Sequence, residues 1–408
     1  MRSQPTTSLV AALRQLALKS PARAIGSSDA QTMARGYDHA MTFSAGSRSS
    51  LGATSHRNRV PRARLLAGCL AIAVVVAFEP RAVLAADPFD ALRVMDSNSG
   101  GYAIFDSLFL QRDNDARQRP LVVDTASGSP RLSTGQLQPD VGIGPRIFVG
   151  RRVDDDWGWE AGYFGVYDMT FTRTLTAPGT LAIDGPLGDG PVFPFGHADS
   201  VVASYASSIN SAEFNSFVSW GDRGVFSGRR WQEGFGFDWL EGVRYFGLAE
   251  QARLGFTCCT TETPPGLTSQ YAVATSNNLV GWQIGGRGRR AWTNWAVEGW
   301  SKVGLFANFQ TQNQAAIIDP VGTGFVYRPS RFERATTAAM VADLNLSLVR
   351  RLSDTWSVRA GYNVIWVGGV AAAPDQWDFS TSAAAGTGLD SGSWVFLSGA
   401  NLGLEARW

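Results

Sequence analysis

Apolar and polar residues alternate one by one at the end of the chain. In Trp394–Trp408, one parity carries Phe396, Leu402, Leu404 and Trp408, and the other carries mainly glycine, Asn401, Glu405 and Arg407. Successive side chains of a β-strand point to opposite faces, so this stretch predicts a strand with one oily and one polar face. A transmembrane barrel strand has this pattern over roughly 9–11 residues, with aromatic residues at its ends.

The same alternation recurs along the chain and predicts ten strands. We expect them at Tyr102–Arg112, Val141–Arg151, Trp157–Thr172, Ile209–Trp220, Phe237–Glu250, Tyr271–Arg287, Trp295–Gln310, Thr336–Arg350, Trp356–Val370 and Trp394–Trp408.

The connections between these strands alternate in length. Arg152–Asp156, Gly288–Asn294 and Arg351–Thr355 are short, and we assign the Gly-rich stretch Gly285–Arg290 to one of these turns. The long connections are rich in Gly, Pro, Ser and Asp, and comprise Leu121–Gln138, Arg173–Ser208, Gln251–Gln270, Thr311–Ala335 and Ala371–Ser393. Short periplasmic turns and long outer loops are typical of outer-membrane barrels. The sequence therefore predicts an all-β, transmembrane, antiparallel up-and-down barrel of about ten strands, with twelve as the neighbouring alternative and with long extracellular loops.

In such a barrel the oily face meets lipid and the polar face lines the lumen, whereas a soluble barrel would have the faces reversed. The lumen-facing polar residues we predict are Glu160, Glu298, Lys302, Asp343, Arg359, Asn363, Glu405 and Arg407. The aromatic girdle we predict at the membrane interfaces comprises Trp157, Trp159, Trp295, Trp356, Trp366 and Trp408.

The first 86 residues differ from the rest in composition. Arg57, Arg59, Arg62 and Arg64 precede an apolar run at 65–78, and small residues follow at Ala85 and Ala86. A basic flank, a short apolar core and small residues form a secretory signal peptide. We therefore divide the chain into an N-terminal extension with a signal peptide (1–86) and a barrel (87–408), exported to the outer membrane of a Gram-negative-type envelope.

Charge and cysteine content narrow the function classes. The chain carries a net charge of +1, but residues 1–85 hold 11 of the 36 basic and 3 of the 35 acidic residues, which leaves −7 beyond them. An acidic body without a basic tract argues against nucleic acid as a partner. Outer-membrane lipid and the outer-membrane assembly machinery are the partners we expect. Cys258 and Cys259 are adjacent, and a vicinal disulfide fits them, but an incidental loop pair is the simpler interpretation.

No set of residues in the sequence forms an active site. His197 is a single loop histidine without a specified nucleophile or acid, which indicates a solvated residue. The acidic turn Asp154–Asp156 has oxygen ligands suited to a hard cation, but a solvated turn is the simpler interpretation. We expect no catalytic, cofactor-binding or metal-binding residues.

Several segments in order resemble the putative beta-barrel porin-7 family of bacterial outer-membrane proteins. They include LFLQRDN at Leu108–Asn114, WLEGVRYFGL at Trp239–Leu248, TSNNLVGWQIGGRGRR at Thr275–Arg290, and the later stretches RAGYNVIWVGGVAAAPDQWDFS and GLEARW. The resemblance covers roughly residues 100–408. It implies an exported outer-membrane barrel, but it provides no functional residues to carry over. Two functions stay open: a porin-like barrel with a narrow polar lumen that passes small solutes, and a non-conducting structural or surface-binding barrel that uses its long loops.

Overall fold

The computed structural model describes residues 100–113, 118–153, 156–220, 225, 231–259, 266–322 and 324–408. The predicted extension and signal peptide lie outside these residues, as do Asp154 and Asp155. Within the described part of the chain, no helix is long and apolar enough to cross a membrane.

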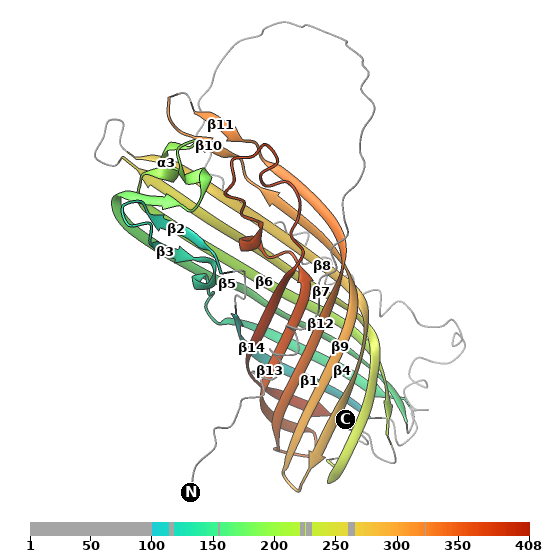
Figure 1. The fold of residues 1–408 in the computed structure, drawn as a ribbon. Helices are drawn as coiled ribbons and strands as arrows, with labels where there is room; N and C mark the ends of the chain where they lie inside the picture. Colours follow the sequence, from blue (N-terminus) through green and yellow to red (C-terminus); the bar gives the residue numbers. More distant parts are fainter. Residues whose placement is uncertain are drawn as a thin grey trace, which may run out of the picture. The chain divides into compact units, whose positions relative to one another are not determined.

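Ten long strands form a closed antiparallel barrel (Figure 1). Each strand pairs with its neighbour in the chain, and β14 returns to pair with β1. The predicted ten-stranded up-and-down barrel is therefore confirmed. Its strands are β1 (Gly101–Asp113), β4 (Gly142–Arg152), β5 (Trp157–Ile183), β6 (Ala198–Ser219), β7 (Gly234–Cys258), β8 (Leu267–Ala291), β9 (Trp295–Gln314), β12 (Arg331–Arg351), β13 (Trp356–Val370) and β14 (Ser393–Arg407).

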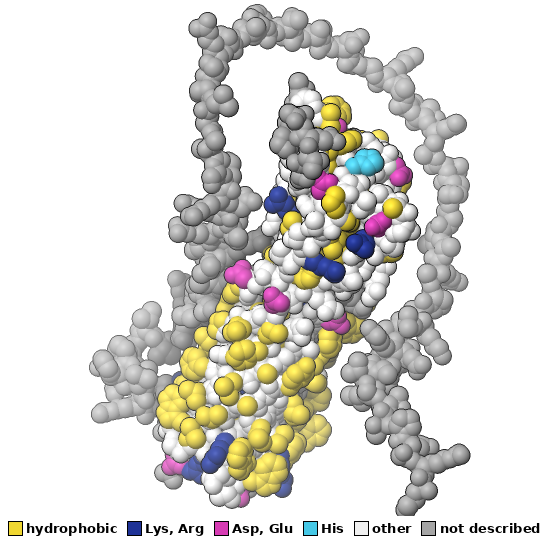
Figure 2. Space-filling view, turned by 90° about the vertical axis from the view of Figure 1, so that its left-hand side faces the viewer, with side chains coloured by type: hydrophobic (Ala, Val, Ile, Leu, Met, Phe, Trp, Pro, Cys, Tyr) yellow, Lys and Arg dark blue, Asp and Glu magenta, His cyan; other side chains and the backbone are white. Residues whose placement is uncertain are grey.

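The alternation along each strand sorts the side chains into two environments. On β13, Ala360 and Tyr362 face outward, while Arg359 and Asn363 are buried inside. On the adjacent β12, Leu344, Leu346 and Leu348 are each about half exposed. Figure 2 shows the result on the face turned to the viewer, where apolar side chains cover the lower part of the barrel, and we call this area the apolar band. A closed sheet with apolar side chains outside and polar side chains inside is the arrangement found in transmembrane β-barrels.

The two ends of the barrel differ. At one end, the short-turn end, strands are joined by tight connections such as that between Arg351 and Trp356. At the other, the loop end, the connections fold into further elements (Figure 1). These are β2 (Pro120–Asp124), β3 (Pro130–Ser133), η1 (Thr134–Gln136), η2 (Pro186–Gly188), α3 (Phe193–Gly196), β10 (Ile317–Asp319), β11 (Phe325–Arg328) and η3 (Ala373–Gln376).

Several predicted boundaries are wrong at the loop end. β5 and β6 continue far into the connection predicted at Arg173–Ser208, where Met169–Thr176 pair with Ser200–Ser207. Most outward positions there are threonines and serines, so the apolar alternation weakens although strand pairing continues. A prediction at the short-turn end is also wrong: Gly285–Arg290 is not a turn, because it lies inside β8 and pairs with β7.

The barrel interior is layered. Along β1, the inward positions run Asp106, Leu108, Leu110 and Arg112 from the short-turn end upward. Charged side chains thus lie below an apolar cluster that includes Leu108, Phe246 and Val367. A second apolar cluster, around Phe195 and Trp377, closes the loop end.

The barrel interior as the candidate functional site

Fifteen buried ionisable side chains fill the interior near the short-turn end, and we call them the charged layer. They are Asp106, Arg146, Arg152, Glu160, Glu213, Asp238, Arg244, Arg287, Arg289, Glu298, Lys302, Asp343, Arg359, Glu405 and Arg407. Eight cations face seven carboxylates, and every carboxylate lies in an ion pair. A buried charge needs such a partner, because an isolated one would lose its hydration without compensation.

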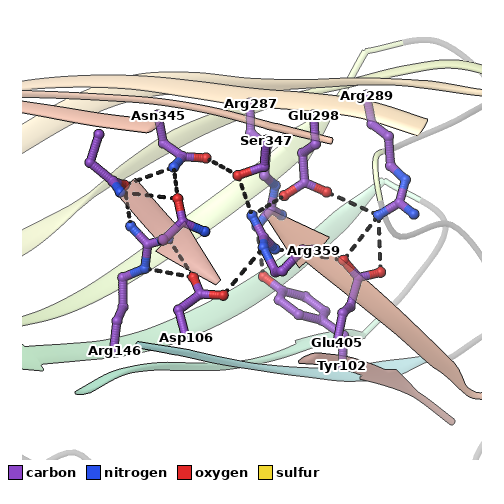
Figure 3. A network of polar contacts seen from close by, with 12 residues as sticks. Tyr102, Asp106, Arg146, Arg287, Arg289, Glu298, Asn345, Ser347, Arg359 and Glu405 are labelled. Carbon is purple, nitrogen blue, oxygen red and sulfur yellow. Dashed lines mark hydrogen bonds and ion pairs between the residues drawn. The ribbon is translucent and has the colours of Figure 1, made fainter. Parts of the chain in front are cut away.

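Arg359 lies at the centre of this layer (Figure 3). Its guanidinium group is 3.5 Å from Asp106 Oδ1, 3.3 Å from Glu298 Oε1 and 3.6 Å from Glu405 Oε2. These carboxylates come from three other strands, β1, β9 and β14. One arginine on β13 therefore links its neighbour β14 with β1 and β9, each of which lies two strands away around the barrel.

The strand register and a glycine on β14 leave space for the contacts between Arg359 and its carboxylates. Gly403 on β14 pairs with both Asp106 and Arg359. A Cβ at Gly403 would lie 2.2 Å from Asp106 Oδ1, so a larger residue would displace that carboxylate. Asp106 also accepts a hydrogen bond of 2.9 Å from Nε of Arg146, its direct partner on β4.

Arg289 and Arg287 extend the network on the β8 side (Figure 3). Arg289 Nη1 is 3.0 Å from both Glu298 and Glu405. Arg287 is 2.6 Å from Glu160 Oε2 and 3.0 Å from Asp238 Oδ2. The Tyr102 hydroxyl joins this group by donating a hydrogen bond of 2.6 Å to Glu160.

Two further ion pairs and the inward-facing Trp300 of β9 complete the charged layer, with Lys302 Nζ 5.7 Å from the Trp300 ring centroid. Lys302 pairs with Glu213, and Arg244 lies 3.2 Å from Asp343 Oδ2. The Trp300 ring centroid is 4.8 Å from Arg146 and 5.6 Å from Arg359, distances at which a ring face attracts a cation.

Little space is left between these side chains. A cavity of about 10 Å³ lies among Glu160, Arg287, Glu298 and Lys302, with Ile104, Phe148, Leu240 and Trp300 as its apolar walls. That volume is close to the minimum needed to hold one water molecule. Around this cavity, the charged side chains pack against one another and against apolar neighbours.

At the loop end, residues 371–392 fold into the mouth of the barrel, and we call them the inserted segment. Asn277 of β8 donates to Ala371 O at 2.9 Å and accepts from Ala371 N at 2.8 Å. Glu250 of β7 accepts from Ala373 N at 2.8 Å, and Arg119 donates to Trp377 O at 2.6 Å. Side chains of the barrel wall thus hold the backbone of this segment.

Asp378 organises the far part of the inserted segment. Its carboxylate accepts from Ser380 N at 2.9 Å and from Gly386 N at 3.1 Å. Partial burial acts to raise the pKa of Asp378, but these hydrogen bonds and the nearby Arg328 outweigh it, so the pKa lies below its usual range.

All eight polar residues predicted for the lumen are buried inside the barrel. Seven of them carry charge and belong to the charged layer. Asn363 touches that layer, since its Oδ1 accepts from Arg146 at 2.6 Å. Charged-layer residues missing from the prediction include Asp106, Arg146, Arg287 and Arg289, together with Tyr102, their hydrogen-bonding neighbour. All lie on the inward parity of their strands, which is the signal that could have identified them.

The six predicted girdle tryptophans do not form a single ring. Trp157, Trp159, Trp295, Trp356 and Trp408 lie at strand ends near the short turns. Trp366 lies near the other border of the apolar band and stacks on Trp394 with ring centroids 4.5 Å apart.

The residues considered in the sequence as catalytic or metal-binding candidates lie apart from one another. His197 is exposed, 5.6 Å from the Phe193 ring. Asp156 is exposed in a turn. Among the described residues, no three His, Cys, Asp or Glu side chains form a group that could hold a metal ion.

Fold and interior together define the class: a transmembrane-type β-barrel with an apolar outer band and a packed polar interior. The chain belongs to the family described as Putative beta barrel porin-7 (BBP7), whose model matches residues 110–408. No curated protein matches it.

Solved structures with some similarity are outer-membrane proteins. The outer membrane protease OmpT from Escherichia coli has a TM-score of 0.40 and 10% identity, over 77% of this chain and 98% of that one. A major outer membrane protein from Thermus thermophilus has a TM-score of 0.30 and 12% identity, over 76% and 99%. Likenesses this distant carry no argument about what the chain does.

Proposed function

We propose that this protein is a closed, non-conducting barrel of the outer membrane, which presents its folded loop end to the outside. The observation that carries the proposal is Arg359, which projects into the interior from β13 and contacts carboxylates on β1, β9 and β14. The apolar cluster and the inserted segment lie above this link. A solute would have to displace all three.

The outer surface supports the membrane location. Half-exposed leucines, valines and aromatic residues encircle the lower barrel, and such an area is far too large for a protein surrounded by water. Tryptophans such as Trp356 and Trp366 lie near the two borders of the band, which is where interface aromatics are enriched. We assign the eight inward polar residues to the closed interior and the six tryptophans to the two interfaces.

Export and assembly complete the proposal. A leader ending near Ala86 would deliver the chain to the envelope, and the assembly machinery would insert the barrel into outer-membrane lipid. The mature chain should then be recovered from the outer-membrane fraction without residues 1 to about 86. Recovery of the uncleaved chain from the cytosol at steady state would contradict this part.

Planar-bilayer recording tests the closed state. The purified protein should give no current steps above those of the bare membrane. Shortening the inserted segment by removing residues 378–390 should leave it silent, since the apolar and charged layers remain. Heat-modifiable migration on gels would show that the shortened barrel is folded. Steady current steps from the intact protein would refute the proposal.

A second candidate is solute passage gated by the inserted segment. Asn308, Gln310, Gln312 and Gln314 occupy successive inward positions of β9 and face this segment. Gln312 Oε1 and both polar atoms of Gln314 have no hydrogen-bond partner among the described residues, although both side chains are buried. An unsatisfied buried amide costs about 1–3 kcal/mol, which favours displacement of the segment by water. This candidate predicts that the shortened variant conducts although the intact protein does not.

A further inference from the structure

Two adjacent cysteines end β7 at the loop end of the barrel. Apart from Cys69, they are the only cysteines in the sequence. Cys258 pairs with Leu267 at the last position of the β7–β8 ladder. The carbonyl of Cys259 then accepts a hydrogen bond of 3.3 Å from Gly266 N.

The backbone brings the two sulfur atoms together. Neighbouring side chains on a strand point to opposite faces, and Cys258 continues the inward row of Leu254 and Phe256. Cys259 departs from that pattern with a φ of 61°, a left-handed conformation that costs a non-glycine residue roughly 1–2 kcal/mol. The two Sγ atoms consequently lie 2.6 Å apart.

We propose that Cys258 and Cys259 form a thiol-oxidation site, which closes to a vicinal disulfide by exchange with external disulfides such as oxidised glutathione. Outside the cytosol, such disulfides persist and protein thiols are oxidised. The site lies at the loop end, where the barrel meets the outside medium.

Burial assigns the order of the two steps. Cys259 is partly exposed, whereas Cys258 is fully buried. The Cys259 thiolate attacks one sulfur of the external disulfide, which breaks its S–S bond and releases one thiol. The Cys258 thiolate then attacks the Cys259 sulfur of the mixed disulfide and releases the second thiol. The protein loses two protons and two electrons, and the external disulfide accepts both pairs.

Thiol counting on the full chain in lipid vesicles tests the site. Before oxidation, maleimide added after the chain is unfolded in denaturant should label both cysteines, as mapped by mass spectrometry of the peptide that carries them. After oxidised glutathione it should label neither, the peptide should be lighter by two hydrogen atoms, and no glutathione should remain bound. Reduction should restore both thiols.

Two serine variants separate the steps. Cys258→Ser lacks the resolving thiol and should retain one glutathione on Cys259. Cys259→Ser keeps only the buried thiol and should take up glutathione at least tenfold more slowly. Equal heat-modifiable migration of both variants controls for folding.

Three results would overturn the proposal. They are continued labelling of both wild-type thiols after oxidation, a stable glutathione adduct on the wild-type chain, and a disulfide that joins two chains. If either variant fails to fold, the mass of the wild-type peptide and the absence of bound glutathione are sufficient to test the proposal.

Discussion

Arg359 is the side chain on which the charged layer depends most. Replacing it with methionine keeps much of the volume but leaves Asp106, Glu298 and Glu405 with one cation fewer. Breaking a buried ion pair by removing one partner costs about 3–5 kcal/mol.

We therefore expect Arg359→Met to lower the free energy of unfolding by about 3–5 kcal/mol in urea titrations of the detergent-solubilised barrel. Arg290→Met is the matched control, because Arg290 is exposed on β8 and should change stability by about 0.5 kcal/mol or less. Equal effects of the two substitutions would show that the charged layer does not hold the walls together.

Individual charges could be predicted from parity, but their partners could not. Glu298 and Arg289 lie on neighbouring strands and could be paired once the register is known. Arg359 and Glu298 are different, because they meet inside the barrel from β13 and β9, which are separated by β12 and do not pair with each other. That contact depends on the diameter of the closed barrel, which no local pattern encodes.

At the scale of secondary-structure elements, the strands within the apolar band could be predicted well from the sequence. The predicted range of β13 is the observed one, because Trp356–Asn363 alternates between lipid-type and polar or small residues and the rest of the strand is rich in β-branched residues. Beyond the apolar band, β5 and β6 carry mostly threonine and serine on their outer face. The sequence there has little alternation of apolar and polar residues, so the continuation of the two strands could not be predicted from it. The insertion of residues 371–392 into the barrel could not be predicted from the sequence either. Hydrogen bonds to Asn277 and Glu250, which are distant in the sequence, hold this segment in place.

Closure of the barrel depends on the contact between β1 and β14. Gly101 and Trp408 exchange two backbone hydrogen bonds of 2.8 and 3.0 Å, and the Trp408 ring lies over Gly101. Trp408→Asp should destabilise the barrel by about 1–2 kcal/mol, because the half-buried ring is lost.

The readout for Trp408→Asp is the folded fraction in membranes, measured by heat-modifiable migration. Ser382→Asp, in an exposed part of the inserted segment, is the control and should fold like the wild type. Indistinguishable folded fractions would remove Trp408 from the closure of the barrel.

The inserted segment should loosen in acid. Because the pKa of Asp378 is lowered in the folded chain, its carboxylate stabilises the segment above the usual aspartate range. That stabilisation falls as the pH drops through the folded pKa. Deuterium uptake of peptides covering 378–390, corrected for the intrinsic exchange rate, should therefore rise in acid.

Asp378→Asn provides the control for this titration. Its amide cannot titrate and has one acceptor oxygen, so uptake should be higher at neutral pH and nearly independent of pH. A wild-type segment whose corrected uptake stays constant through the carboxylate range would count against Asp378 as its anchor.

At the scale of the whole molecule, an apolar outer face encloses a polar interior rich in buried ion pairs. β12 and β13 offer neighbouring positions on the two sides of one wall. Ala360 faces outward, whereas Ser347, opposite Gly361, is 1% exposed inside the barrel. Serine and cysteine differ little in size, so Ser347→Cys perturbs the interior less than a change at Asn363 would.

Labelling of single cysteines at these positions tests both faces at once. With Cys258 and Cys259 replaced by serine, each variant in outer-membrane vesicles is treated with a lipid-dissolved and a water-soluble maleimide. We predict that Ala360→Cys reacts only with the lipid-dissolved reagent, that Ser347→Cys reacts with neither, and that Ser382→Cys reacts with the water-soluble one. Aqueous labelling at 347 would contradict the closed interior, and a position 360 shielded from lipid would contradict the membrane barrel itself.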